Sequence, residues 1–194
     1  SYEFKKGKVM KIKTLDKIGG VVFLFLTIAT IVVFLSDTSF FEWAFTRHQN
    51  TLSWYIRPLF IIPIVMGAYK KSYSLIFFSI FCLFTSMFWF PKPEIVDVKV
   101  IEFLNFEKTY FTSGWSIEKV IILATILAFF TAIISLTWSR RWYGLLATVV
   151  IGAFLKVAHS LLFSGGSGIS IVKPAVLGLI LCILVIYFIF KRRK

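Results

Sequence analysis

Residues Ile18–Leu35 read IGGVVFLFLTIATIVVFL, an apolar run of 18 residues that contains no charged side chain. At 1.5 Å of rise per residue such a helix is about 27 Å long, close to the roughly 30 Å thickness of a bilayer's hydrocarbon core. A surface helix of a soluble protein needs a polar stripe, and this run has none. The run therefore predicts a helix that crosses a membrane.

Further apolar runs follow along the chain. With the first, the candidate spans are Ile18–Leu35, Leu52–Tyr69, Tyr73–Phe90, Val120–Trp138, Trp142–Phe163 and Pro174–Phe190. The sequence is 58% hydrophobic and 16% charged, and a soluble domain of 194 residues cannot bury so much apolar surface. We predict an all-α integral membrane protein, a bundle of six transmembrane helices. The second span is the weakest, because Arg57 and Pro63 interrupt it, and a kinked or re-entrant segment is the alternative there.

This six-span arrangement puts 14 of the 22 Lys and Arg residues on one side of the membrane. They are the six lysines before the first span, Lys70 and Lys71, Arg140 and Arg141, and Lys191, Arg192, Arg193 and Lys194. Positive residues are enriched in cytoplasmic loops, so we predict a multi-pass protein of the cell membrane with both termini cytoplasmic. Five spans would move the C-terminal basic cluster outside.

The same pattern predicts three parts: a basic cytoplasmic N-terminal segment (residues 1–17), a transmembrane domain (residues 18–190) and a basic cytoplasmic tail (residues 191–194). Met10 is a candidate native start within the first part. Cys82 and Cys182 fall in mid-span, where thiols act as small apolar side chains, so we expect no disulfide.

Both longer loops lie on the outer side in this arrangement. In residues 36–51 the capping-box pattern Ser39-Phe40-Phe41-Glu42 predicts a short helix in the membrane interface. Residues 91–119 are apolar enough to pack on the bilayer or on the bundle, and they carry five acids: Glu94, Asp97, Glu102, Glu107 and Glu118. We expect interfacial helical segments in these loops.

Two bases precede a proline at expected helix starts, in Arg57-Pro58 and Lys173-Pro174. A cation there opposes the helix dipole, and a bound anion would relieve that cost. The alternative is that each base extends to the lipid headgroups.

The candidate site gathers polar residues of the outer side. Lys156 and His159 are three residues apart and share a helix face, and a lysine at this depth is costly without a compensating partner. With the acids in loops, a bound phosphate or carboxylate is the expected counter-charge. The candidate ligands of such an anion are Arg47, Arg57, Lys156, Lys173 and Ser167, the last in the turn Ser164–Gly168, with Trp54 bordering the acyl chains. His48 or His159 could act as a general base, with Glu42 as its orienting group.

These residues predict binding of an anionic or phosphate-bearing lipid or amphiphile at the outer leaflet, with or without its chemical processing. The alternatives are a small transporter or channel with a path lined by Lys156 and His159, or a structural subunit of a membrane complex. The formal charge of +13 would suggest nucleic acid in a soluble chain, but here the bases flank apolar runs. We expect lipid partners, no nucleic acid, no metal and no cofactor, since no such motif is present.

Overall fold

The computed structural model describes the backbone of residues 2–191, and the side chains of residues 13–164 and 166–188. The chain is all-helical, with 86% of residues in helices and no strand in the described part. In chain order the elements are α1 (Tyr2–Ser36), α2 (Thr38–His48), α3 (Leu52–Leu59), α4 (Ile61–Lys70), α5 (Tyr73–Thr85), η1 (Ser86–Phe88), α6 (Val98–Thr112), α7 (Ile117–Trp138), α8 (Trp142–Phe163), η2 (Gly165–Gly168) and α9 (Ile169–Lys191).

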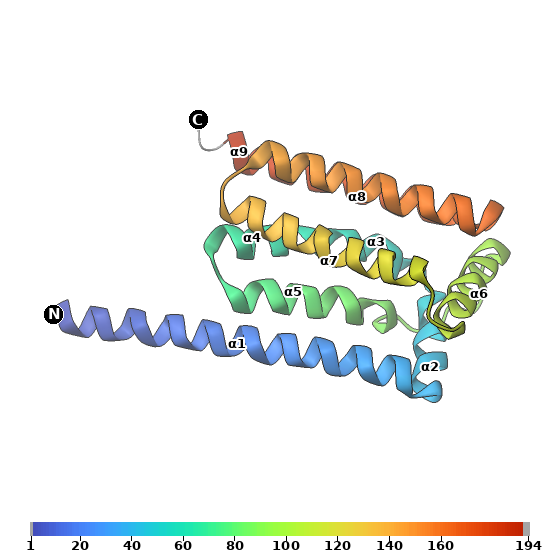
Figure 1. Ribbon diagram of the computed structural model, residues 1–194, viewed down its shortest axis with the longest axis horizontal. Coiled ribbons are helices and arrows are strands. Elements are labelled where there is room, and N and C mark those ends of the chain that lie inside the picture. Colours follow the sequence, from blue (N-terminus) through green and yellow to red (C-terminus); the bar gives the residue numbers. More distant parts are fainter. Residues whose placement is uncertain (1, 192–194) are drawn as a thin grey trace.

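The long helices lie side by side, and the shorter α2 and α6 lie across one end of the bundle (Figure 1). We call this end, with α2, α6 and η2, the loop end. The opposite end, where α4 turns into α5 and α7 into α8, is the turn end. Helix α1 begins and α9 ends near the turn end (Figure 1).

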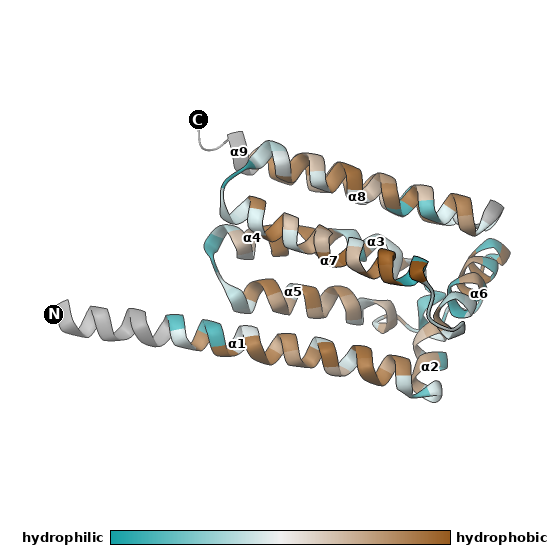
Figure 2. Cartoon of the chain, in the orientation of Figure 1, coloured by the Kyte–Doolittle hydropathy of each residue, from teal (hydrophilic) through white to brown (hydrophobic). Residues whose placement is uncertain are grey.

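Five helical stretches of the described chain are long and apolar enough to cross a membrane, as expected of a multi-pass membrane protein. They are Lys13–Ser36, Leu52–Lys70, Ile117–Trp138, Trp142–Phe163 and Gly166–Phe188. Figure 2 shows hydrophobic residues along these helices and polar residues at the turns between them. The second predicted span, expected to be the weakest, meets the length requirement, whereas the third, Tyr73–Phe88, is a shorter apolar helix.

The second span is two helices joined at Phe60, which keeps an α-helical conformation and bonds to the Arg57 carbonyl at 3.2 Å. Pro58 and Pro63 lie on either side of this junction, and neither has the N–H that would bond to the carbonyl four residues earlier. The interruption at Phe60 therefore follows from the two prolines.

The expected helix starts at Pro58 and Pro174 are wrong. Helix α3 begins at Leu52 and α9 at Ile169, so both prolines lie inside their helices. Arg57 is in the last turn of α3, where the helix dipole favours a cation. The helix dipole therefore gives no reason for a bound anion at these bases.

The capping-box interpretation is also corrected. Helix α2 begins at Thr38, and its cap is Asp37, whose carboxylate accepts a hydrogen bond from the Phe40 N–H at 2.8 Å. Asp has the stronger capping geometry here because it directly precedes the first helical residue.

Helix α1 supplements the cap of α5, whose own N-cap is Ser72, the hydroxyl of which accepts a hydrogen bond from the Leu75 N–H at 3.3 Å. Asp16 accepts hydrogen bonds from the Ser72 hydroxyl at 2.5 Å and the Tyr73 N–H at 2.8 Å, and its carbonyl accepts from the Ser74 hydroxyl at 2.6 Å. A Cβ added to Gly20 would lie 2.8 Å from that of Tyr73, so the glycine permits the close approach. The carboxylate satisfies N–H groups that a helix start leaves open.

The two turns at the turn end interlock. Lys71 and Arg140 both have the left-handed conformation, with φ of 57° and 60°. The Lys71 ammonium lies 5.6 Å from the Trp138 ring, and the Arg140 guanidinium lies 3.6 Å from the Tyr69 ring. Each turn thus places its base on an aromatic ring of the other, which ties the α4–α5 pair to the α7–α8 pair.

Candidate functional site

A buried histidine and a partly exposed arginine form the centre of the loop-end cluster. Nη1 of Arg57 lies 3.3 Å from Nε2 of His48, and Nδ1 of His48 lies 2.9 Å from the Ser53 hydroxyl. A guanidinium can only donate, so Nε2 accepts and Nδ1 carries the proton. The Ser53 hydroxyl accepts that proton's hydrogen bond and donates to the Asn50 carbonyl at 2.8 Å.

His48 is held neutral. It is only 4% exposed, and burial lowers the pKa of the imidazole well below its ordinary 6.5; the charges of Arg57 and Lys156 lower it further, and the Met87 backbone acts in the opposite direction. Both ring nitrogens are engaged. In this arrangement His48 holds the Arg57 guanidinium in place.

Glu107 of α6 lies between two cations. Its carboxylate is 3.7 Å from the Lys156 ammonium and also interacts electrostatically with Arg57. The loop acids were expected to leave Lys156 without a protein counter-charge, and that expectation is wrong. The loop containing Glu107 folds into a helix that packs across the bundle end and brings the carboxylate to α8.

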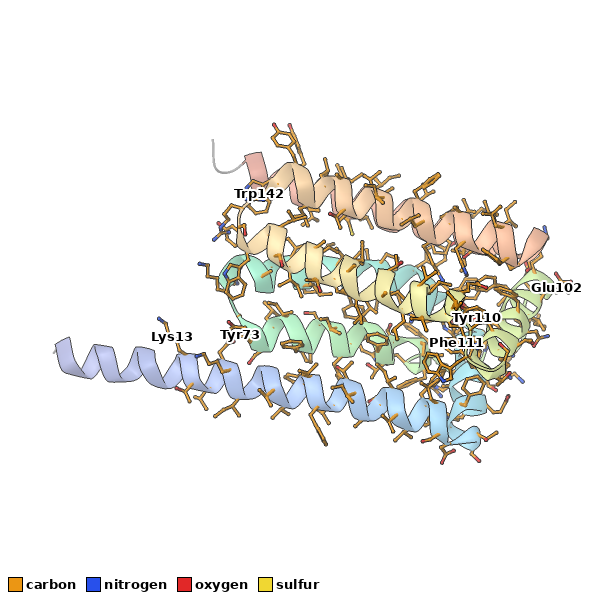
Figure 3. All side chains as sticks on the ribbon, viewed as in Figure 1. Lys13, Tyr73, Glu102, Tyr110, Phe111 and Trp142 are labelled. Atoms are coloured by element: carbon orange, nitrogen blue, oxygen red, sulfur yellow. The ribbon has the colours of Figure 1, made fainter. Side chains whose placement is uncertain are left out.

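A second polar group lies beside the first. Nε2 of His159 is 3.8 Å from the Glu118 carboxylate, an ion pair only when the imidazole is protonated. The Tyr110 ring meets the His159 ring edge-on, with centroids 6.3 Å apart. Burial raises the pKa of the Tyr110 phenol, and the Glu118 charge raises it further. Figure 3 shows Tyr110 on α6 at the loop end, far from Trp142 at the turn end.

Arg47 and Glu42, predicted for the same site, make other contacts. Arg47 donates to the carbonyls of Phe88 at 2.6 Å and Trp89 at 3.3 Å, and so joins α2 to the end of η1. Glu42 forms an ion pair with Lys108 of α6. Both residues tie α2 to its neighbours, and no contact joins them to Arg57 or Lys156 within the described part of the chain.

Trp54 borders the Arg57 group, because its ring centroid lies 5.7 Å from that of His48, whereas no described contact joins Ser167 or Lys173 to the group. Trp54 is 7% exposed in an apolar cluster with Phe41, Phe45, Val100, Phe103 and Leu104, and its indole N–H donates to the His48 carbonyl at 3.0 Å. The Ser167 hydroxyl donates to the Ser164 carbonyl at 2.8 Å within its own turn. Lys173 is exposed, with no ion pair to any side chain that the structure describes.

Two shallow depressions lie at the turn end, away from this cluster. One, of about 410 Å³, is lined by residues 140–144; the other, of about 330 Å³, lies between Lys17 and Phe77. They coincide with none of the predicted site residues.

The site residues that the sequence did not single out are Ser53, Glu107, Tyr110 and Glu118. A signal was present: Glu107 and Tyr110 are three residues apart, as are Lys156 and His159, so each pair shares a helix face. What the sequence lacked was the information that these two faces pack together.

Comparison with family models, with curated proteins and with solved structures finds no match to this chain, so its function has to be argued from the site itself.

Proposed function

We propose that this protein binds the anionic headgroup of a lipid or amphiphile at the outer leaflet, through Arg57 and Lys156. The observation that carries the proposal is the charge balance around Glu107. Two cations share this one carboxylate, and the adjacent His48 is neutral. The group has a net charge of +1, which an anionic headgroup would balance.

The geometry of the cations suits this role. His48 engages only one donor of the Arg57 fork, so the guanidinium is fixed in position with other N–H groups available. The Lys156 side chain is 55% exposed and its contact with Glu107 is long, so the ammonium can reach a ligand without losing a tight ion pair.

The proposal includes a six-span topology with both termini cytoplasmic. The short helix Tyr73–Phe88 would be the remaining span, between α4 and the loop end. This topology gathers Lys70, Lys71, Arg140 and Arg141 on the cytoplasmic side together with the basic ends of the sequence. The loop end would then face outward, with helices α2 and α6 in the interface.

A through-membrane path has less support. Apolar residues fill the middle of the bundle: Ile64, Val65, Ile133, Leu145, Val149, Cys182 and Ile186. The buried hydroxyls of Thr27, Ser79 and Thr137 donate to carbonyls of their own helices rather than to one another. These features favour a site on one side of the membrane over a polar channel.

Lipid retention tests the proposal. The purified protein is placed in nanodiscs made of phosphatidic acid and phosphatidylcholine, and the lipids that stay bound are identified by native mass spectrometry. The wild-type protein should retain phosphatidic acid in preference to phosphatidylcholine. Arg57→Gln and Lys156→Met should each lower that preference roughly tenfold or more, the range for loss of one charged contact. Lys99→Met is the matched control, because Lys99 is an exposed lysine of α6 without a place in the cluster.

The proposal fails if the wild-type protein retains both lipids equally, or if Lys99→Met weakens retention as much as Lys156→Met. Thermal unfolding of each variant shows that the comparison concerns folded protein.

A further inference from the structure

Two buried polar atoms in the second group have no hydrogen-bond partner among the described residues: the Tyr110 hydroxyl and Nε2 of His159. Leaving such groups buried and unpaired is unfavourable, and most buried polar atoms in proteins find a partner. The nearest charged atom, on Glu118, lies 3.8 Å from Nε2, too far for a hydrogen bond. A small polar ligand would therefore give both atoms the hydrogen-bond partner that the described residues do not provide.

The hydrogen-bond donors and acceptors of the group indicate which kind of ligand fits it. Tyr110 offers a donor or an acceptor, His159 either one according to its tautomer, and Glu118 an acceptor. The Phe163 ring packs against the His159 ring in a tilted arrangement, with centroids 4.8 Å apart, and gives the group an apolar wall. A set of mixed donors and acceptors beside aromatic rings suits hydroxyl groups, which both donate and accept.

Its position relates the second group to the headgroup site. Two residue pairs join α6 to α8: Glu107 contacts Lys156, and Tyr110 contacts His159. Three residues separate the pairs on each helix, a rise of about 4.5 Å. A phosphate and a hydroxyl on the glycerol or sugar bonded to it are separated by a similar distance, since only a few bonds lie between them.

A lysine lies over the aromatic ring of Tyr110. The Lys119 ammonium lies 5.1 Å from the Tyr110 ring centroid and donates to the Ser113 carbonyl. A lysine has four rotatable bonds and can leave this position without moving the backbone.

We infer that Tyr110, His159 and Glu118 form a subsite for the hydroxyl groups of the headgroup, so that the ligand is an anionic lipid whose phosphate carries a glycerol or sugar. This inference rests on the proposed binding of the phosphate by Arg57 and Lys156. It adds a preference: a polyhydroxylated anionic lipid binds more tightly than phosphatidic acid, which has the phosphate alone.

Competition between phosphatidylglycerol and phosphatidic acid in the same nanodisc assay tests this inference. The wild-type protein should retain phosphatidylglycerol about threefold or more over phosphatidic acid, as one or two neutral hydrogen bonds provide. Tyr110→Phe should remove this preference and leave retention of phosphatidic acid relative to phosphatidylcholine unchanged. Lys156→Met should weaken retention of both anionic lipids.

Tyr187→Phe is the control, because Tyr187 is an exposed tyrosine of α9 outside the cluster. Tyr110→Phe should also fold normally, with a thermal midpoint equal to or above that of the wild type, because the hydroxyl that it removes has no hydrogen-bond partner among the described residues.

The outcomes separate the two proposals. If the wild type shows no preference for phosphatidylglycerol, or if Tyr110→Phe keeps that preference, the subsite holds only a buried water and the inference is wrong, while binding of phosphatidic acid still supports the headgroup site. If neither anionic lipid is retained over phosphatidylcholine, the headgroup site itself fails.

Discussion

A single histidine shows how much the surroundings of a residue decide its role. In the sequence, His48 is a candidate general base beside Arg47. In the structure its two nitrogens are occupied by Arg57 and Ser53, and the ring is buried and neutral. No sequence pattern reports whether an imidazole's nitrogens are already engaged, so this difference could not be predicted.

The neutral state of His48 predicts a pH dependence of folding stability. In the unfolded chain the imidazole titrates near 6.5, whereas in the folded protein its pKa is lower. As the pH falls below about 6.5, the unfolded state takes up a proton that the folded state does not, so the free energy of unfolding decreases, by at most about 1.4 kcal/mol per pH unit. Thermal unfolding in detergent between pH 7.5 and 5 measures this loss.

His48→Gln should flatten this dependence, because glutamine keeps an acceptor for Arg57 but does not titrate. The wild type and the His48→Gln variant both contain His159, so any effect of His159 on stability cancels when the two are compared. An equally steep loss of stability in the variant would show that another group is responsible.

At the scale of elements, helix ends were harder to predict than helix bodies. The apolar runs locate α7, α8 and α9, but α9 begins five residues before Pro174 and α2 is capped by Asp37 rather than Ser39. Helix starts depend on side chains that reach backbone N–H groups, and these side chains can come from another helix. Asp16 of α1, which caps α5, is 56 residues from Ser72 and leaves no local pattern.

The Asp16 cap predicts a measurable contribution to stability. Asp16→Ala leaves the N–H groups of Tyr73 and Ser74 at the start of α5 without their acceptor and removes a contact between two helices, and it should lower the free energy of unfolding by about 1–2 kcal/mol. Thermal unfolding in detergent gives the shift. Asp97→Ala, which removes the cap of the exposed start of α6, should have a smaller effect because it joins no second helix; equal shifts would contradict the special role of Asp16.

For the whole molecule, composition and run length predict the membrane-spanning helical class, and the structure agrees at that level. The site was predicted only in part: the shared face of Lys156 and His159 follows from their spacing, whereas Glu107 and Glu118 appeared as loop acids without partners. Their roles depend on how α6 crosses the bundle end, which is a matter of tertiary packing.

The proposed topology can be tested by cysteine labelling. The starting variant carries Cys82→Ala and Cys182→Ala, so that neither of the two buried free thiols can react with the label. A membrane-impermeant maleimide should label the Ile95→Cys variant in intact cells, since Ile95 is 91% exposed at the loop end. The Lys194→Cys variant should react only after permeabilisation, and its labelling in intact cells would reverse the orientation.

In the proposed six-span topology the short helix α5 would be the one span shorter than the bilayer is thick. Sixteen residues of α5 and η1 give about 24 Å, less than a hydrocarbon core. Residues of α2 cover the end of η1. Arg47 donates to its carbonyls, and the rings of Phe40 and Trp43 pack on the Phe88 ring, with centroids 5.6 and 5.3 Å away. In the proposed six-span topology these contacts would compensate the hydrophobic mismatch of α5 with protein rather than by thinning of the lipid, and the five longer helical stretches would set the acyl-chain length that suits the protein.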